Sequence, residues 1–226
     1  MKITTKDIAG VEYALKAMRL PMKSKGDSSS AVTFTLGGTE EVLLLGEKDA
    51  KLAKTLSGAK PGSGHDSFIK GISVIAELKA NHAFWLQWMR YSFADIISSE
   101  SKMHSIVKGS IGDSCDKWVS SSTINLVDDL IYAYNNYVDA GEDHEYLFEG
   151  FMLNNLPTTK KELFECIISN TPIGYELTAG VTLNYLTLKT MYKQRKSHKL
   201  SYWNTEFVEW VETLPYSWLI TGKKDV

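Results

Sequence analysis

Apolar residues recur every three or four positions near the start of the chain, at Ile8, Val11, Leu15 and Met18. This spacing predicts a helix that Thr5 caps and Pro21 ends. A polar, Ser-rich stretch at residues 23–30 then predicts a loop. Apolar and polar residues next alternate at 32–36, and an apolar run follows at 42–45, beyond a Gly-Gly pair. Two such segments around a glycine turn predict a β-hairpin.

The following stretch changes from one hydrophobic period to another. A short helix is expected at residues 49–56, and the Gly, Pro and Ser content of residues 57–64 predicts a flexible connection, either a lid or a plain linker. Apolar residues then alternate over 72–78, which is typical of a strand, and the pattern becomes helical from Asn81 to Met89. An irregular loop is expected around residues 98–104.

The middle of the chain, residues 105–170, is predicted to be helical. Its clearest stripe covers residues 124–138, and Thr159 with Glu162 forms a capping box ahead of another apolar run. Residues 172–183 alternate in part, and helices are expected at 184–196 and 203–214. Together these elements predict a single α+β domain over residues 1–226.

Length, charge and cysteine content narrow the class of protein. A chain of 226 residues suits one domain, and 43% hydrophobic residues allow a sizeable core. A net charge of −2 argues against duplex nucleic acid as the main partner. Cys115 and Cys166 stand far apart without metal-ligand spacing, so we expect no metal site and a reducing cytoplasm. No signal peptide or membrane-spanning run is apparent.

One candidate ligand contact lies on the helix expected after Asn81. Gln87 and Arg90 are three residues apart and so share a face, from which an amide and a guanidinium can grip a base edge and a phosphate. The alternative is a surface arginine packed over Trp88 or Tyr91.

A second polar cluster follows at residues 98–101, with Lys102 and His104 directly after it. Its hydroxyls, carboxylate and imidazole suit a hydrogen-bonded ligand cradle or an activated nucleophile. The alternative is a helix N-cap, in which Ser98, Glu100 or Ser101 satisfies backbone donors without any ligand.

A basic run gathers at the end of the predicted helix 184–196 and comprises Lys193, Arg195, Lys196, His198 and Lys199. Such a run forms either an anion site or a solvated helix end that complements the macrodipole. No GxGxxG, GxxxxGK[ST], HExxH or GxSxG motif is present, which removes Rossmann, P-loop, zincin and α/β-hydrolase interpretations.

Residues 79–92, KANHAFWLQWMRYS, resemble a segment of the flavin-dependent thymidylate synthases (ThyX). In that family a Lys-Ala pair precedes a helix that ends in Gln-Trp-x-Arg-His-Arg, and the matching residues here are Lys79, Ala80, Gln87, Trp88 and Arg90. The family signature continues as x-x-Ser-x-Asn-Glu-x-Ser-x-Arg-Tyr. Residues 98–104 align with its last seven positions after a one-residue insertion, and Ser101 is retained.

A second match covers residues 183–198, which are similar to a later family helix that carries Asn, Arg and His. Asn184, Arg195 and His198 fit this pattern, and His65 precedes the predicted strand much as a family histidine does. The resemblance therefore covers roughly residues 65–104 and 175–215.

The resemblance implies a twisted antiparallel sheet packed with helices and a homotetramer whose sites are shared between subunits. It also implies FAD as a cofactor near the signature, with a deoxyuridine monophosphate beside it. By the same resemblance the nucleotide contacts are Gln87, Arg90, Ser99, Ser101 and Arg195, with Ser101 as the candidate catalytic residue. The implied cofactor contacts are His65, Asn184 and His198.

Several charged positions of the family differ in this chain. Arg-His-Arg is replaced by Arg90-Tyr91-Ser92, the signature Glu by Ser99, and its last Arg by Met103. Losing one arginine–phosphate contact costs about 1.5–3 kcal/mol, so these changes weaken binding of the usual pair of ligands. The departures point to a divergent branch of the family.

Proteins encoded by bacteriophages and prophages share the Ser-x-Met-His ending of the loop, here residues 101–104, and the basic segment at 195–200. The sequence therefore predicts a divergent, phage-encoded protein of the host cytoplasm that binds a nucleotide in an inter-subunit cleft. One alternative is an active flavin-dependent enzyme that methylates or modifies a dUMP-like pyrimidine nucleotide. Others are a non-catalytic sponge for a host nucleotide signal and a structural protein that binds no small molecule.

Overall fold

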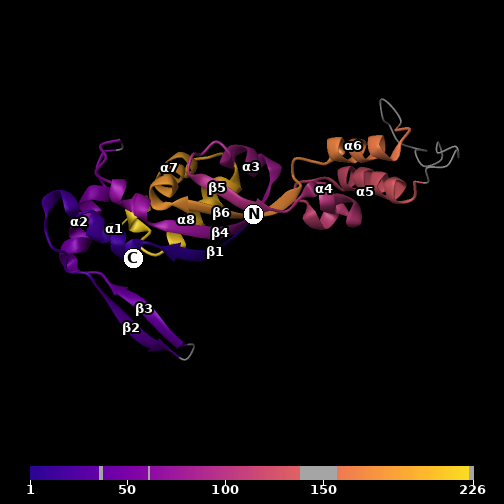
Figure 1. The fold of residues 1–226 in the computed structure, drawn as a ribbon. Helices are drawn as coiled ribbons and strands as arrows, with labels where there is room; N and C mark the ends of the chain where they lie inside the picture. Colours follow the sequence, from indigo (N-terminus) through magenta and orange to yellow (C-terminus); the bar gives the residue numbers. More distant parts are fainter. Residues whose placement is uncertain (36–37, 61, 138–156, 224–226) are drawn as a thin grey trace. The chain divides into compact units, whose positions relative to one another are not determined.

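The computed structural model describes residues 1–35, 38–60, 62–137 and 157–223 (Figure 1). Within these residues, four strands form one sheet in the order β1-β4-β6-β5. The strands are β1 (Lys2–Ala9), β4 (Ser73–Asn81), β5 (Ala94–Ser99) and β6 (Glu176–Asn184). Helices account for 51% of the structure and strands for 20%, which confirms the predicted α+β class with an antiparallel sheet.

The helices are distributed along the whole described chain. They are α1 (Val11–Ala17), α2 (Glu47–Ser57), α3 (His82–Trp88), α4 (Lys102–Ser105), α5 (Ser121–Asn135), α6 (Lys160–Asn170), α7 (Tyr185–Arg195), α8 (Val208–Thr213) and α9 (Trp218–Thr221). The 3₁₀ segments are η1 (Leu20–Met22), η2 (Ser67–Gly71), η3 (Ile106–Lys108) and η4 (Ile111–Ser114), and the π-helical segment is η6 (Tyr202–Phe207).

The chain divides into two compact units. Unit 1 consists of Met1–Leu78, Trp88–Ile97 and Gly180–Val226, and unit 2 consists of Lys79–Gln87 and Ser98–Ala179. The prediction of a single domain remains an expectation.

The N-terminal residues form a strand, and the predicted helix start at Thr5 is therefore wrong. Residues 2–9 are strand β1 of the sheet, and helix α1 begins only at Val11. Gly10 separates them with a φ of 87°, a left-handed conformation in which a helix cannot continue. A Cβ at this position would lie 2.0 Å from the carbonyl oxygen of Gly71, so the strand–helix junction depends on glycine.

The elements that follow α1 in the chain confirm the predictions from hydrophobic period. Strands β2 (Ser29–Thr35) and β3 (Gly38–Leu44) pair antiparallel, from Ser29 opposite Leu44 to Thr35 opposite Gly38. Figure 1 shows this hairpin extending away from α1 and α2 of the same unit. Helix α2, strand β4 and helix α3 also fall where the sequence predicts them.

The connection after α2 contains two glycines in left-handed conformations. Gly62 has a φ of 81° and Gly64 a φ of 78°, which suits the turn content of the predicted connection 57–64. Residue 61 of that connection lies outside the described residues, and Ser57 still belongs to α2.

Residues 98–104 are regular, so the expected irregular loop is wrong. Ser98 and Ser99 complete strand β5, and residues 102–105 form the short helix α4 with Ser101 at its N-cap. The Glu100 carboxylate accepts a hydrogen bond from the Thr178 amide at 2.7 Å, and the Glu100 amide donates to the Thr178 carbonyl at 2.8 Å. The predicted alternative was a helix N-cap formed by a side chain of this run. Ser101 does occupy the N-cap position of α4, but its side chain makes no capping hydrogen bond, and Glu100 binds strand β6 instead.

Helices α5 and α6 of unit 2 enclose their own core. Val127 and Leu130 of α5 and Leu163 and Ile167 of α6 are buried in it. Thr159 accepts a hydrogen bond from the Glu162 amide at 3.2 Å, as the capping box predicts, while the Glu162 carboxylate reaches the Thr158 amide. Of the predicted helical region 105–170, residues 138–156 lie outside the described residues.

Helix α7 lies at the centre of unit 1. It packs on η2, α8 and α9, and Trp203 of η6 is fully buried nearby in the same unit. Lys189 of α7 is 4% exposed and donates hydrogen bonds to the Asp66 carboxylate at 2.6 Å and to the Ser57 carbonyl. This buried ion pair joins α7 to the ends of α2 and of the 58–66 connection.

Candidate functional site

A hollow of about 530 Å³ opens on the surface of unit 1 over the start of α7. We call it the Arg90 hollow. The residues around it include Lys70, Arg90, Tyr91, Phe93, Asn184 and Thr190. Arg90 and Asn184 belong to the two separate segments that resemble the flavin-dependent thymidylate synthases, and the fold brings both to one hollow.

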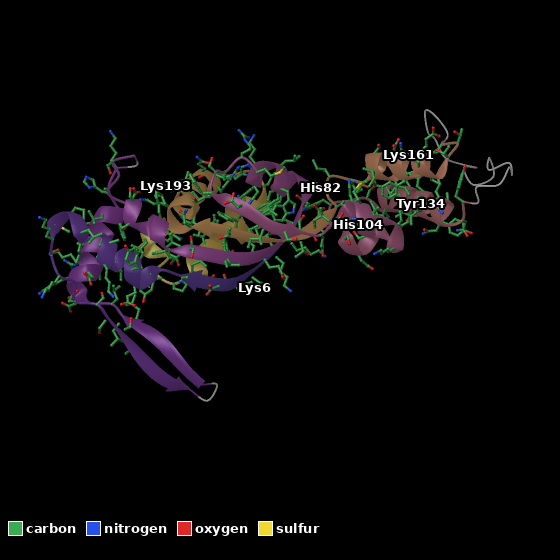
Figure 2. All side chains as sticks on the ribbon, viewed as in Figure 1. Lys6, His82, His104, Tyr134, Lys161 and Lys193 are labelled. Atoms are coloured by element: carbon green, nitrogen blue, oxygen red, sulfur yellow. The ribbon has the colours of Figure 1, made fainter. Side chains whose placement is uncertain are left out.

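A second hollow of about 510 Å³ adjoins the first, and we call it the Lys193 hollow. The two hollows share Lys70, Leu186 and Thr190 as common wall. Asp66, Lys189 and Lys193 also face the second hollow, and Figure 2 labels Lys193 on the ribbon of unit 1. Each hollow has a volume within the range of roughly 300–1,000 Å³ that is usual for small-molecule sites.

The charge around the two hollows is predominantly positive. Lys70, Arg90 and Lys193 have no ion pair or hydrogen bond from their side chains within the described residues. The carboxylate among the residues that line the Lys193 hollow is Asp66, and it is paired with Lys189. Burial lowers the pKa of Lys193, as do the charges of Lys189 and Lys196. The hollows therefore suit an anionic ligand.

Arg195 is held between two aromatic rings in unit 1. Its guanidinium carbon lies 4.3 Å from the centre of the Trp203 ring and 5.2 Å from that of Tyr91. Its Nε donates to the Tyr91 hydroxyl at 2.7 Å, and that hydroxyl donates to Gln194 at 2.9 Å. The sequence offered a stack of Arg90 on Tyr91 as an alternative. In the structure Arg195 stacks on Tyr91, and Arg90 lines the Arg90 hollow.

Phe93 has the least relaxed backbone at the Arg90 hollow. Its φ is 63°, a conformation that a bulky side chain adopts only at a cost, and its side chain is 72% exposed. Strained residues of this kind gather at ligand sites. An exposed ring at the edge of a cationic hollow can stack on a nucleobase.

Asn184 lies in the Arg90 hollow and also starts helix α7. Its Oδ1 accepts hydrogen bonds from the Thr187 amide at 3.0 Å and from the Thr187 hydroxyl at 3.3 Å. The acceptor oxygen of this side chain is thus used as the N-cap.

The other two cofactor contacts implied by the resemblance lie elsewhere in unit 1. His65 is exposed in a turn, and the His198 ring meets Trp203 edge-on at 6.4 Å. Burial and the nearby Arg195 charge lower the pKa of His198. Of the three implied flavin contacts, Asn184 lines the Arg90 hollow.

Unit 2 carries the remaining predicted nucleotide contacts. Ser101 lines a separate hollow of about 320 Å³ with Glu100, His104 and Lys108. Ser99 is exposed on β5, and Gln87 is half-buried on α3. The structure describes no group of three or more His, Cys, Asp or Glu side chains placed to hold a metal ion. Within the same residues, no helix is both long and apolar enough to cross a bilayer.

Sequence reasoning missed Lys70 and Phe93 as residues of the hollows. Phe93 gave no signal because a left-handed backbone is not visible in the residue type. Lys70 stands in a 3₁₀ segment just before a strand, and only the packing of η2 on α7 brings it to the shared wall.

The described residues have an α+β fold, and cationic side chains line two adjoining hollows of unit 1. No protein-family model and no curated protein sequence matches the chain. Among solved structures, thymidylate synthase X (ThyX) from Helicobacter pylori with FAD and dUMP matches with a TM-score of 0.67 at 14% identity, over 98% of both chains. A flavin-dependent thymidylate synthase ThyX from Helicobacter pylori, also with FAD and dUMP, matches with a TM-score of 0.58 at 15% identity, over 98% of this chain and 99% of the other. The chain therefore has the ThyX fold.

Proposed function

We propose that the protein binds a phosphate-bearing nucleotide in the Arg90 hollow, as a divergent protein with the ThyX fold. One observation carries this proposal: Arg90 and Asn184, far apart in sequence, line one hollow together with Lys70, which has no ion-pair partner in the described residues. An arginine fork suits a phosphate, and the exposed Phe93 ring suits a base.

The arrangement assigns a role to each group. The Arg90 guanidinium takes two oxygens of the phosphate nearest the sugar, and Lys70 adds charge from the shared wall. Phe93 and Tyr91 offer ring surface to the base. The Asn184 amide nitrogen can donate to the ligand while the Asn184 oxygen caps α7.

Three further features follow from the family resemblance: a site completed between subunits of a homotetramer, a phage-encoded origin, and action in the host cytoplasm. The further proposed nucleotide contacts are Gln87, Ser99, Ser101 and Arg195. When bound, FAD would supply hydride chemistry, with His65, Asn184 and His198 as its proposed contacts, and Asn184 lines the Arg90 hollow.

Calorimetry with nucleoside monophosphates tests the proposal. Arg90→Ala should weaken binding of the preferred nucleotide by about 10- to 100-fold, the loss expected for a charged hydrogen-bonded contact. Lys196→Ala is the matched control, since Lys196 is an exposed cation at the end of α7 that lines neither hollow. Absence of binding to any nucleotide, or equal binding by the Arg90 variant, would contradict the proposal.

The fold also favours a second candidate, a flavin-dependent enzyme that modifies a dUMP-like nucleotide, because both solved structures contain FAD and dUMP. In this candidate Ser101, beside His104 in the unit 2 hollow, orients the substrate or acts as nucleophile. Flavin absorbance after addition of FAD, together with nucleotide-dependent oxidation of the reduced flavin, supports the enzyme. Tight nucleotide binding without either signal supports a non-catalytic protein that sequesters a host nucleotide signal.

A further inference from the structure

We infer that the unit 2 hollow is a second small-molecule site, which takes a small sugar phosphate through the buried hydroxyl of Tyr175. The inference goes beyond the proposed function, since it concerns unit 2 and uses no group of the Arg90 hollow. Tyr175, Ser114 and Lys108 also lie outside the nucleotide and cofactor contacts implied by the resemblance.

Tyr175 supplies a buried hydroxyl that has no partner. The residue is 5% exposed, belongs to the core of unit 2 and lines the hollow of about 320 Å³. Within the described residues its hydroxyl makes no hydrogen bond, yet the oxygen is not sealed from solvent. A buried tyrosine hydroxyl normally finds a partner, so a ligand in the hollow is the best explanation for this one.

The hydroxyls lie deeper in the hollow than the basic groups. Ser114 is half-buried, and in the described part of the chain its hydroxyl, like that of Tyr175, makes no hydrogen bond. His104 and Lys108 line the same hollow and are exposed. Hydroxyls both donate and accept, which suits the hydroxyls of a sugar, whereas basic groups at the mouth suit a phosphate. The order of these groups matches a molecule that inserts its sugar and leaves its phosphate at the opening.

The charge at the mouth is available to an anion. Lys108 has no ion-pair partner among the residues that the structure describes. The carboxylate among the lining residues belongs to Glu100, and its Oε2 accepts a hydrogen bond from the Thr178 amide at 2.7 Å. A phosphate placed beside Lys108 therefore meets a cation that no carboxylate has neutralised.

One wall of the hollow is fixed before any ligand binds. Asp128 of α5 accepts hydrogen bonds from the Ser110 hydroxyl at 2.5 Å and from the Ile111 amide at 2.8 Å. Ile106 and Ile111 are each 2% exposed and anchor the same segment in the core of unit 2. The segment that carries Lys108 and Ser114 is thus held in place, so little entropy is lost when a ligand binds. The volume lies near the lower end of the range for small-molecule sites, which suits a small ligand.

Calorimetry of the full chain with ribose 5-phosphate, ribose and inorganic phosphate tests the inference. The wild-type protein should bind ribose 5-phosphate about tenfold or more tightly than ribose or phosphate alone, because both sets of contacts are used. Tyr175→Phe removes only the hydroxyl and should weaken binding of ribose 5-phosphate about tenfold, with phosphate binding unchanged. Tyr132→Phe is the matched control, since Tyr132 is 68% exposed on α5 and does not line the hollow.

Two further variants separate the depth of the hollow from its mouth and keep the test decisive if Tyr175→Phe fails to fold in thermal unfolding. Ser114→Ala should weaken binding of ribose 5-phosphate and leave phosphate binding unchanged. Lys108→Met should weaken binding of both. Lys117→Met is the control for the lysine, because Lys117 is exposed in unit 2 outside the hollow.

Ribose 5-phosphate that binds no more tightly than inorganic phosphate would overturn the inference, as would a preference that survives both Tyr175→Phe and Ser114→Ala. Displacement of ribose 5-phosphate by dUMP would also overturn it, because the hollow would then belong to the nucleotide site. Arg90→Ala should leave binding of ribose 5-phosphate unchanged. Failure of every nucleotide to bind would contradict the proposed function alone.

Discussion

At the scale of single residues, Phe93 has a left-handed backbone that reduces stability at the edge of the Arg90 hollow. A left-handed backbone costs a residue with a side chain about 1–2 kcal/mol. Burial of the ring offsets little of this conformational cost, since 72% of the side chain is exposed to solvent. Such a residue is best explained by what its ring does at the edge of the Arg90 hollow.

Phe93→Asn should separate stability from binding. Asparagine tolerates a φ of 63°, so the free energy of unfolding should rise by about 0.5–1 kcal/mol. Nucleotide affinity should fall because the ring that stacks on the base is lost. Urea denaturation and calorimetry measure the two quantities, and Phe93→Tyr, which keeps an aromatic ring, is the control. A less stable Asn variant with unchanged affinity would refute the stacking role.

Arg195 shows how a residue of the family pattern can be retained in a new setting. The position before Ser92 holds Tyr91 in place of the family histidine, and its hydroxyl accepts a hydrogen bond from Arg195. With Trp203 on its other side, the Arg195 guanidinium is oriented by two rings. If the proposed nucleotide contacts Arg195, the fixed orientation of the guanidinium lowers the entropy lost on binding.

At the scale of elements, helix α7 joins the structural and binding roles of unit 1. Asn184 caps its first turn, Lys189 ties it to the end of α2, and Thr190 and Lys193 face the hollows. A substitution on this helix can therefore change folding, binding or both, and matched variants are needed to tell them apart.

Asn184→Ala and Asn184→Asp form such a pair. Alanine removes the cap and should lower the free energy of unfolding by about 1 kcal/mol. Aspartate keeps an acceptor for the Thr187 amide and should leave stability nearly unchanged. Both should weaken nucleotide binding, aspartate more strongly because it brings a negative charge into a cationic hollow. Thermal unfolding and calorimetry distinguish the two effects, and full affinity of the Asp variant would exclude Asn184 from the site.

The buried pair of Lys189 and Asp66 should behave as a unit. Lys189→Met leaves the Asp66 carboxylate buried without its cation and should cost about 3–5 kcal/mol. The double variant Lys189→Met with Asp66→Asn should be more stable than Lys189→Met alone, since no uncompensated charge remains. Urea denaturation of the single and double variants measures this coupling. Additive effects of the two substitutions would show that the pair does not act together.

Prediction from sequence succeeded where one hydrophobic period continued over a long stretch of the chain. The stripe in α5 and the alternation in β4 identified both elements, because their cores select one face at every turn. It failed at residues 2–9, where apolar residues of strand β1 and helix α1 happen to share a helical spacing across Gly10. It also failed at 98–104, where strand β5 exposes all but its first residue, so no alternation between buried and exposed positions marks it.

The candidate site was predicted in part for a related reason. Arg90 and Asn184 were found by resemblance to a family motif, and the fold places both at one hollow. Lys70 and Phe93 depend on packing between distant segments and on a local backbone angle. Neither the long-range packing nor the backbone angle can be predicted from the amino-acid sequence alone.

At the scale of the whole molecule, the ThyX fold persists at 14–15% identity over nearly the full chain. Buried positions of a fold tolerate apolar exchange, whereas each charge at a ligand site is specific to its ligand. The replacement of family charges by Tyr91, Ser99 and Met103 is therefore compatible with an intact fold and an altered ligand. The cations around the two hollows are the groups on which the proposed nucleotide binding depends.

The proposed homotetramer leads to a prediction about strand β5. This strand lies at an edge of the sheet, and Ile96 and Ile97 are 41% and 58% exposed, with Met89 exposed shortly before them. An edge strand with exposed apolar side chains is unfavourable in a monomer, because it invites pairing with other chains. Burial between subunits would remove this surface from water, at roughly 25 cal/mol for each Å² of apolar area.

Sedimentation velocity should therefore give a mass about four times the 25.3 kDa of the chain. Ile97→Lys should shift the protein to smaller species, because a lysine at the centre of an apolar contact loses its hydration without gaining a partner. Leu20→Lys is the control, since Leu20 is 68% exposed on the 3₁₀ segment η1. A monomeric wild-type protein would contradict the tetramer, and a tetrameric Ile97→Lys variant would show that the subunits meet through another surface. If the variant dissociates and nucleotide affinity falls with it, the site is completed between subunits, as the ThyX resemblance implies.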